Sequence, residues 1–133
     1  MRVVLDTNVV VSAFLRRDGN CGLALERVAR GDLKLCVDPR ILYEYDLVLK
    51  RPRFKFEAAW IEDFFEMVED AAEMVEAPAL DVKLPDPKDL MFLEVAAAAA
   101  ALLVTGNLKD FPKDRCGGVR VVSPAEFVRL IGA

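Results

Sequence analysis

The chain has 133 residues, which leaves room for one domain. Hydrophobic residues make up 54% of it and charged residues 30%, a balance typical of a compact globule with a buried core. The net charge is −4, so nothing global indicates a nucleic-acid partner, and there is no histidine. The lack of histidine excludes Ser-His-Asp and Cys-His catalysis and leaves any chemistry to carboxylates, amides, hydroxyls and cations.

Neither a membrane anchor nor a secretion signal is evident. The longest uniform apolar run, the alanines at 96–101, is far shorter than the roughly 18 residues that a membrane span needs. Asp6 interrupts the start of the chain, where a signal peptide would continue apolar. Cys21, Cys36 and Cys116 are odd in number and have no pairing pattern, which favours free thiols, although the count allows one disulfide. We expect a cytoplasmic protein without a membrane partner.

Short apolar runs alternate with helical patterns along the first half of the chain. Asp38-Pro39 is typical of a helix N-cap followed by proline at the first helical position. The helix expected at 58–72 has an acidic outer face. The expected strands cover residues 2–5 and 33–37, and the expected helices cover residues 9–15, 21–30, 40–50 and 58–72.

The second half continues the alternation after a proline-punctuated loop at 78–87. Asp86-Pro87 predicts the start of a helix that runs through the alanines, and Ser123 with Glu126 predicts a capping box for a last helix ending near Gly132. Strands are expected at 102–105 and 119–122, with a loop at 106–118. Strands alternating with helices predict a three-layer α/β/α domain over 1–133 with a mainly parallel central sheet.

Several acids and amides follow strands or open helices. Asp6 comes directly after the first strand, and Asn107 and Asp110 come after the strand at 102–105, where sites form in parallel sheets. Each has a simpler interpretation: Asp6 is a candidate helix cap, and Asn107 and Asp110 are typical turn residues. Asp89, three residues after the expected cap Asp86, is compatible with a role at the helix dipole.

Glu44 lies on the predicted helix at 40–50. At roughly 100° per residue it falls between Leu47 and Val48, on the inward-facing arc with Ile41 and Tyr45. An acid among core positions is costly unless it is paired or bound to a metal. The alternative is an acid at the edge of a partly exposed helix.

The order of these features resembles the PIN-domain family over nearly the whole chain, and most closely its branch of toxin components of toxin–antitoxin systems. The matching segments are LDTNVVVSA at 5–13, ILYE at 41–44, RPRF at 51–54 and VTGNLKDF at 104–111. The resemblance implies a metal-dependent ribonuclease that hydrolyses RNA.

By this resemblance, three acids would hold Mg²⁺ or Mn²⁺: Asp6, Glu44 and Asp89. Asn107 occupies a fourth position that is often Asp in the family, with Asp110 close behind. Thr7, Asn8 and Thr105 would support the first acid and the metal shell. The amide at Asn107 leaves a second metal with one charge fewer, and unbroken alanines replace a usual glycine turn before the next strand.

The chemistry of the residues agrees with such a site. Mg²⁺ and Mn²⁺ prefer oxygen ligands, which a histidine-free cluster supplies. A bound cation activates water for attack on a phosphodiester and offsets charge on the leaving oxygen. Converging carboxylates without a cation repel one another and raise their pKa values. The cation is therefore part of what makes the cluster tolerable.

Candidate partners follow from local charge and from the resemblance. Residues 50–55 gather four cations that are candidates for RNA phosphate contacts: Lys50, Arg51, Arg53 and Lys55. The family suggests an antitoxin whose helical peptide lies across the active-site groove. The helix at 58–72 and the apolar face of 9–15 are candidates for that contact or for a homodimer, and packing within the monomer is the alternative.

Other functional classes fit less well. An aspartyl-phosphate phosphatase needs Asp-x-Asp after the strand, and Asn8 stands at the second acid position. A dinucleotide-binding domain needs a glycine-rich turn after the first strand, which is missing. A non-catalytic PIN-like module that binds RNA or a protein partner remains the alternative to the nuclease; Asn107 favours it, and the three acids oppose it.

Overall fold

The computed structural model describes residues 1–132 and is built around a parallel five-stranded sheet of order β3-β2-β1-β4-β5. All four strand pairs are parallel, which confirms the predicted sheet. The strands are β1 (Arg2–Leu5), β2 (Lys34–Val37), β3 (Glu73–Met74), β4 (Leu102–Val104) and β5 (Val121–Val122).

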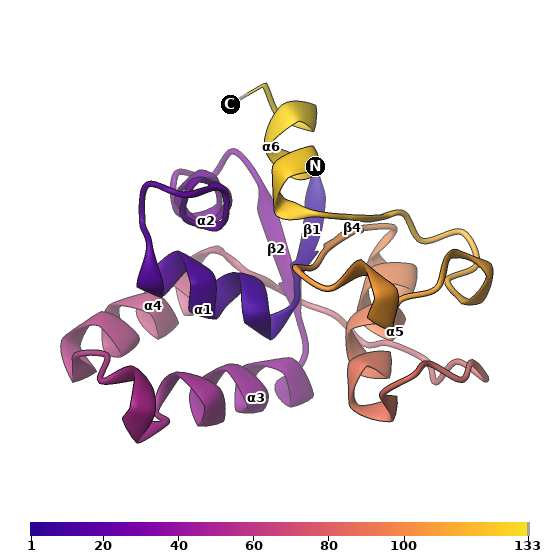
Figure 1. The fold of residues 1–133 in the computed structure, drawn as a ribbon, viewed down its shortest axis with the longest axis horizontal. Helices are drawn as coiled ribbons and strands as arrows, with labels where there is room; N and C mark the ends of the chain where they lie inside the picture. The colour runs from indigo at the N-terminus through magenta and orange to yellow at the C-terminus, as the bar shows by residue number, and fades with distance from the viewer. Residues whose placement is uncertain (133) are drawn as a thin grey trace.

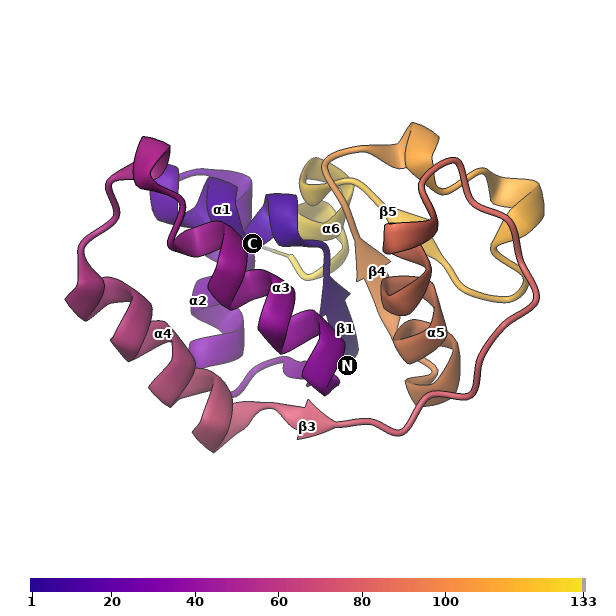
Figure 2. The same cartoon turned by 90° about the horizontal axis from the view of Figure 1, so that it is seen from below.

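Helices cover both faces of the sheet. Figures 1 and 2 show α1 to α4 on one side of the strands and α5 on the other, and α6 packs against α2. The bounds are α1 (Thr7–Leu15), α2 (Asn20–Ala29), α3 (Pro39–Leu49), α4 (Ala58–Ala71), α5 (Leu90–Ala99) and α6 (Pro124–Leu130). This is the predicted three-layer α/β/α arrangement. Within residues 1–132, no helix has the length and apolar character that crossing a bilayer would require.

Burial on both faces explains why the strands read as unbroken apolar runs. Val3, Val4 and Leu5 of β1 are all fully buried, as are Leu35 and Val37 of β2. A strand with one solvent-facing side would instead alternate apolar and polar residues. The core therefore lies along β2, β1 and β4, and it holds the carboxyl ends of these strands in fixed register.

One of the two predicted Asp-Pro helix starts agrees with the structure and the other does not. Asp38 caps α3, because its Oδ1 accepts a hydrogen bond from the Ile41 N–H at 3.0 Å. Asp86 accepts from the Lys88 N–H at 3.0 Å, but this cap opens a single 3₁₀ turn at Pro87–Asp89, and α5 begins only at Leu90. The helix therefore starts later than the cap residue predicts.

Two sequence-based expectations were wrong. The pattern missed β3, which has only two residues and pairs with β2 through its backbone, so it leaves no periodic signal. The inward-facing arc assigned to α3 was too wide. The buried stripe consists of Ile41, Tyr45 and Leu49, while Leu47 is 54% exposed. Glu44 is half-buried at the edge of that stripe.

Tyr45 anchors α3 to the central strand. Its ring is fully buried, and its hydroxyl donates a hydrogen bond to the carbonyl oxygen of Leu5. Tyr45 follows Glu44 in the chain and Leu5 precedes Asp6. This bond therefore connects the segments that carry these two candidate site residues. A buried polar group needs such a partner, because it has lost its water.

We expect Tyr45→Phe to lower the free energy of unfolding by roughly 1 to 3 kcal/mol, since a buried carbonyl oxygen loses its donor. Urea denaturation followed by circular dichroism measures this change. Tyr43→Phe is the matched control, because Tyr43 is 69% exposed on the same helix. Equal denaturation midpoints for the two variants would contradict an anchoring role for Tyr45.

Candidate active site

The candidate site forms where β1 and β4 end side by side. Leu5 pairs with Val104 in the sheet, and the Asp6 N–H donates to the Val104 carbonyl at 2.9 Å. The next residues, Asp6 and Thr105, therefore meet at the same edge. The Thr105 hydroxyl donates to Asp6 Oδ2 at 2.8 Å. Both side chains are buried, so the chain fixes the direction in which the Asp6 carboxylate points.

Asn8 connects the turn after β1 with the turn after β4. Its Nδ2 donates to Asp6 Oδ2 at 3.3 Å, and its Oδ1 accepts from the Gly106 N–H at 2.9 Å. A Cβ atom at position 106 would lie 3.3 Å from Asn8 Oδ1, closer than side chains normally approach. Glycine at position 106 therefore allows the close approach of Asn8, a role that the sequence pattern did not indicate.

Glu44 reaches the same edge from α3. The Thr7 hydroxyl, in the first turn of α1, donates to Glu44 Oε2. Thr7 is buried and Glu44 half-buried, so the bond holds the carboxylate toward Asp6 and away from bulk solvent. The predicted supporting residues Thr7, Asn8 and Thr105 therefore all contact a candidate acid.

Neither Asp6 nor Asp89 acts as a helix cap through its side chain. Both stand at the N-cap position, Asp6 for α1 and Asp89 for α5, and neither side chain accepts a capping hydrogen bond. The first turn of α1 still acts on Asp6, because the N–H groups of Thr7 and Asn8 lower the pKa of its carboxyl. The dipole of α5 still favours an acid at Asp89, but its carboxylate stays available for another ligand.

The carboxylates lie close enough to perturb one another. The pKa of Asp89 is raised from its ordinary value of 3.8 to about 7, most strongly by burial and then by the charges of Asp6, Asp86, Asp110 and Glu44 in that order. The structure therefore brings residues from four separate segments into one field of negative charge.

Asp6 experiences two opposing influences. Burial raises its pKa above the ordinary value, and the charge of Glu44 adds to this effect. The hydrogen bond from Thr105 and the N–H groups of Thr7 and Asn8 lower the pKa in turn. These donors stabilise the carboxylate form that a cation would bind.

Asn107 and Asp110 form a pair at the turn after β4. Asn107 Nδ2 donates to Asp110 Oδ2 at 2.6 Å, and the Asn107 N–H donates to the Thr105 hydroxyl at 3.1 Å. The turn interpretation thus holds for the Asn107 backbone. The Asp110 carboxylate contributes to the negative charge around Asp89 and raises its pKa.

In residues 1–132, no three Asp, Glu, Cys or His side chains are arranged as a ready metal cage. Glu44 is engaged by Thr7 and Asp110 by Asn107. Mg²⁺ usually takes only one or two carboxylates and retains several water ligands. Asp6 and Asp89 meet that requirement with oxygen donors whose mutual repulsion a cation would relieve. The donor set therefore fits Mg²⁺ or Mn²⁺.

The cationic segment after α3 is only partly free. Lys50 pairs with Asp46 at 2.7 Å, while the Arg53 guanidinium lies 4.8 Å from the centre of the Phe54 ring. Arg51, Arg53 and Lys55 are exposed. Three of the four predicted phosphate-binding cations are thus presented to solvent without an acidic partner in the described residues.

The sequence analysis missed one buried acid. Glu94 on α5 is 4% exposed and pairs with Arg40 at 2.7 Å. Its signal was available, because an acid between Leu93 and Val95 in an otherwise apolar stretch needs a partner. The partner lies 54 residues earlier in the chain, however, and the sequence alone does not identify it.

Known proteins share this fold. A family model described as the PIN domain matches residues 2–109, and no match was found among curated protein sequences. Similar solved structures are DNA-bound VapBC from Salmonella typhimurium (TM-score 0.67, 18% identity, covering 93% of this chain and 98% of that chain), VapBC2 from Rickettsia felis bound to a promoter DNA fragment (0.60, 18%, 92% and 98%) and FitAcB from Neisseria gonorrhoeae (0.62, 15%, 92% and 98%).

The raised pKa of Asp89 predicts how stability depends on pH without metal. Below about pH 4 this carboxyl is protonated in both folded and unfolded chains. As the pH rises toward 7, the unfolded chain releases the proton more readily, so the free energy of unfolding falls. Asp89→Asn removes this contribution and should flatten the fall between pH 4 and 7. Urea denaturation across that range measures it; parallel pH curves for the two proteins would contradict the assigned pKa.

Proposed function

Because the chain belongs to the PIN-domain family, we propose that it is a single-domain metal-dependent ribonuclease that hydrolyses RNA phosphodiester bonds. The observation that carries the proposal is the cluster around Asp89, where burial and then the charges of neighbouring carboxylates raise its pKa to about 7. A cluster of this kind opposes its own ionisation unless a cation binds. Perturbed carboxylates of this kind are concentrated at catalytic sites.

Asp6 and Asp89 are the proposed direct ligands of Mg²⁺ or Mn²⁺, with Glu44 completing the set directly or through water. When bound, the cation supplies activation of water and neutralisation of charge on the phosphate. Asp110 is the proposed source of the fourth charge, with Asn107 holding it at 2.6 Å. An amide oxygen brings no charge, so a second cation at Asn107 would bind more weakly than the first.

The other residues would orient the acids for this reaction. Thr105 and Asn8 hold one oxygen of Asp6, which leaves the other oxygen available for a ligand. Thr7 holds Glu44 in the same way. Without a cation the cluster would repel the phosphodiester anion, so substrate binding and metal binding are expected to be coupled.

RNA is the proposed substrate, with Arg51, Arg53 and Lys55 as phosphate contacts beyond α3. Their exposure, and the absence of acidic partners within residues 1–132, support this role. Lys50 is the weakest of the four candidates, since Asp46 already neutralises it at 2.7 Å. A chain with a net charge of −4 needs such a local patch to approach a polyanion.

An antitoxin is the proposed protein partner. The Salmonella typhimurium and Rickettsia felis structures are VapBC assemblies bound to DNA. In this chain, a groove of about 410 Å³ lies between α1, α2 and α4, and its lining includes Phe14, Leu25, Trp60, Phe64 and Met67. Residues of α1 and α4 line this groove, and these are the two segments predicted to contact an antitoxin helix or a second copy of the chain. We also propose a cytoplasmic location.

We expect Asp6→Asn and Asp89→Asn each to abolish Mg²⁺- or Mn²⁺-dependent cleavage of a mixed RNA substrate, because each removes a proposed direct ligand. Neither variant should lower the melting temperature without metal, because each removes repulsion. The matched control is Asp114→Asn, an exposed acid outside the cluster that should retain activity. Full cleavage by the wild-type protein in excess EDTA would sink the proposal, and a wild type that binds RNA without cutting it would favour the non-catalytic module.

Replacing Arg51, Arg53 and Lys55 with glutamine should reduce the salt dependence of RNA binding. Each lost phosphate contact lowers the slope of log K against log salt by roughly 0.7 for single strands, so the triple variant should lose about 2. Fluorescence anisotropy in EDTA, which prevents cleavage, measures the slope. A matched control removes three exposed cations elsewhere: Arg30, Lys34 and Arg129. If both triple variants kept the wild-type slope, the segment would be an ordinary solvated surface.

A further inference from the structure

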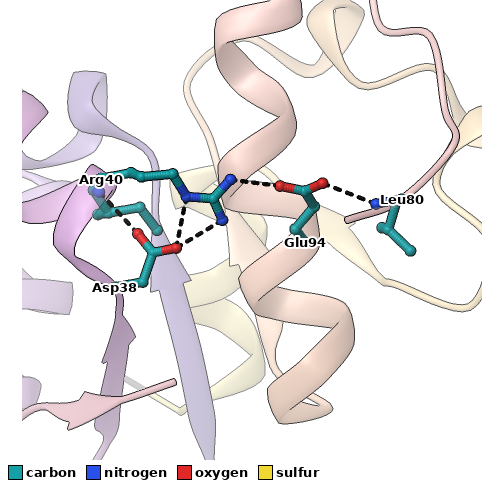
Figure 3. A network of polar contacts seen from close by, with 5 residues as sticks. Asp38, Arg40, Leu80 and Glu94 are labelled. Atoms are coloured by element: carbon teal, nitrogen blue, oxygen red, sulfur yellow. Dashed lines mark hydrogen bonds and ion pairs between the residues drawn. The ribbon is translucent and has the colours of Figure 1, made fainter. Parts of the chain in front are cut away.

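One arginine joins two nearly buried acids from different helices. Arg40 Nε and Nη2 donate to Asp38 Oδ2 at 2.9 and 2.7 Å, and Nη1 donates to Glu94 Oε1 at 2.7 Å. The side chains of Asp38 and Glu94 are 7% and 5% exposed (Figure 3). We name this group of three residues the Arg40 clasp.

Every remaining acceptor in the clasp is also engaged. Asp38 Oδ1 accepts from the Ile41 N–H at 3.0 Å, and Glu94 Oε2 accepts from the Leu80 N–H at 2.8 Å. Breaking a pair that involves buried acids is strongly destabilising, because a charge is left without a partner. The planar fork of arginine places three separate nitrogens against the two acids, a geometry that the single nitrogen of lysine does not reproduce.

The clasp connects the elements that carry the proposed ligands. Arg40 precedes Glu44 by one helical turn on the same face of α3, and Glu94 follows Asp89 within the first turns of α5. Leu80 lies in the irregular segment between β3 and the turn that ends at Asp89. Figure 3 shows Arg40 bonded to one oxygen of Glu94 and Leu80 bonded to the other, so Glu94 lies between the guanidinium and this segment.

We propose that Arg40 is a positioning residue whose clasp sets the placement of Glu44 relative to Asp89 and so the affinity for metal. This inference rests on the proposed nuclease function. The Arg40 guanidinium donates its hydrogen bonds to Asp38 and Glu94 and not to Asp6, Glu44 or Asp89, so it acts on the site through Asp38 and Glu94. Apart from the clasp, the segment before Asp89 is tied by a bond from Arg115 Nη1 to the Lys83 carbonyl at 2.6 Å.

The test compares Arg40→Met with the double variant Arg40→Met/Glu94→Gln. The double variant neutralises Glu94, one of the two acids that lose their partner, while the new amide oxygen can still accept from the Leu80 N–H. We expect Mn²⁺ affinity, measured by electron paramagnetic resonance without RNA, to fall at least tenfold in both variants, as is typical when support for a metal ligand is lost. The double variant should recover part of the melting temperature, since Asp38 still lacks its partner, but none of the affinity. The control is Val28→Ala, which creates a cavity at a fully buried position of α2 away from the clasp. It shows how far a loss of stability by itself lowers Mn²⁺ affinity.

Hydrogen exchange of the metal-free proteins provides a readout independent of metal. Amides of residues 78–94 should exchange at least about tenfold faster in both clasp variants, and no such selective change should appear in Val28→Ala. Wild-type Mn²⁺ affinity in the double variant, or unchanged exchange at 78–94, would overturn the inference. If the wild-type protein itself bound no Mn²⁺, the proposed function would fail, and the exchange comparison would still decide whether Arg40 holds α3 and α5 together.

Discussion

Repulsion among carboxylates at the carboxyl end of the sheet is the constraint on which the rest of this structure depends. Asp6 and Asp89 approach from different segments, with Glu44 and Asp110 near enough to raise the pKa of Asp89. An isolated carboxylate in such a place would be expelled to solvent or protonated. Hydrogen bonds to these acids, such as that from Thr105 to Asp6, and the rigid ends of parallel strands instead hold the acids in position. The chain thus stores an unfavourable charge arrangement that a divalent cation would relieve.

Packing of the sheet and helices offsets the repulsion among these carboxylates. The strands are buried on both faces, and parallel pairing places the ends of β1 and β4 next to each other. Tyr45 fixes α3 to β1 beside Glu44, and Arg40 fixes α3 to α5. Both contacts lie behind the acids rather than among them. The repulsion among the acids is therefore opposed by packing and by hydrogen bonds of neighbouring residues, as is common where function and stability compete.

Some features could be predicted from the sequence, although the pattern at Asp86 placed the start of α5 too early. The apolar strands, the cap at Asp38 and the proximity of Asp6 to the turn after β4 follow from burial, local hydrogen bonding and the rule that parallel strands end at one edge. The exposure of Leu47 could not be foreseen, because it depends on how far α3 rotates against β1. The partner of Glu94 was equally inaccessible, because a single sequence does not say which distant cation meets a buried acid. The two-residue strand β3 carries no pattern at all.

The proposed metal site can be tested most directly by locating the cation in a crystal. Crystals grown with Mn²⁺ and measured at the manganese absorption edge give an anomalous signal at each bound ion. The account predicts an anomalous peak for an Mn²⁺ ion whose ligands are carboxylate oxygens of Asp6 and Asp89, together with water or Glu44. This peak should be lost in crystals of the Asp6→Asn variant. A wild-type structure at saturating Mn²⁺ with no peak between Asp6 and Asp89 would contradict it.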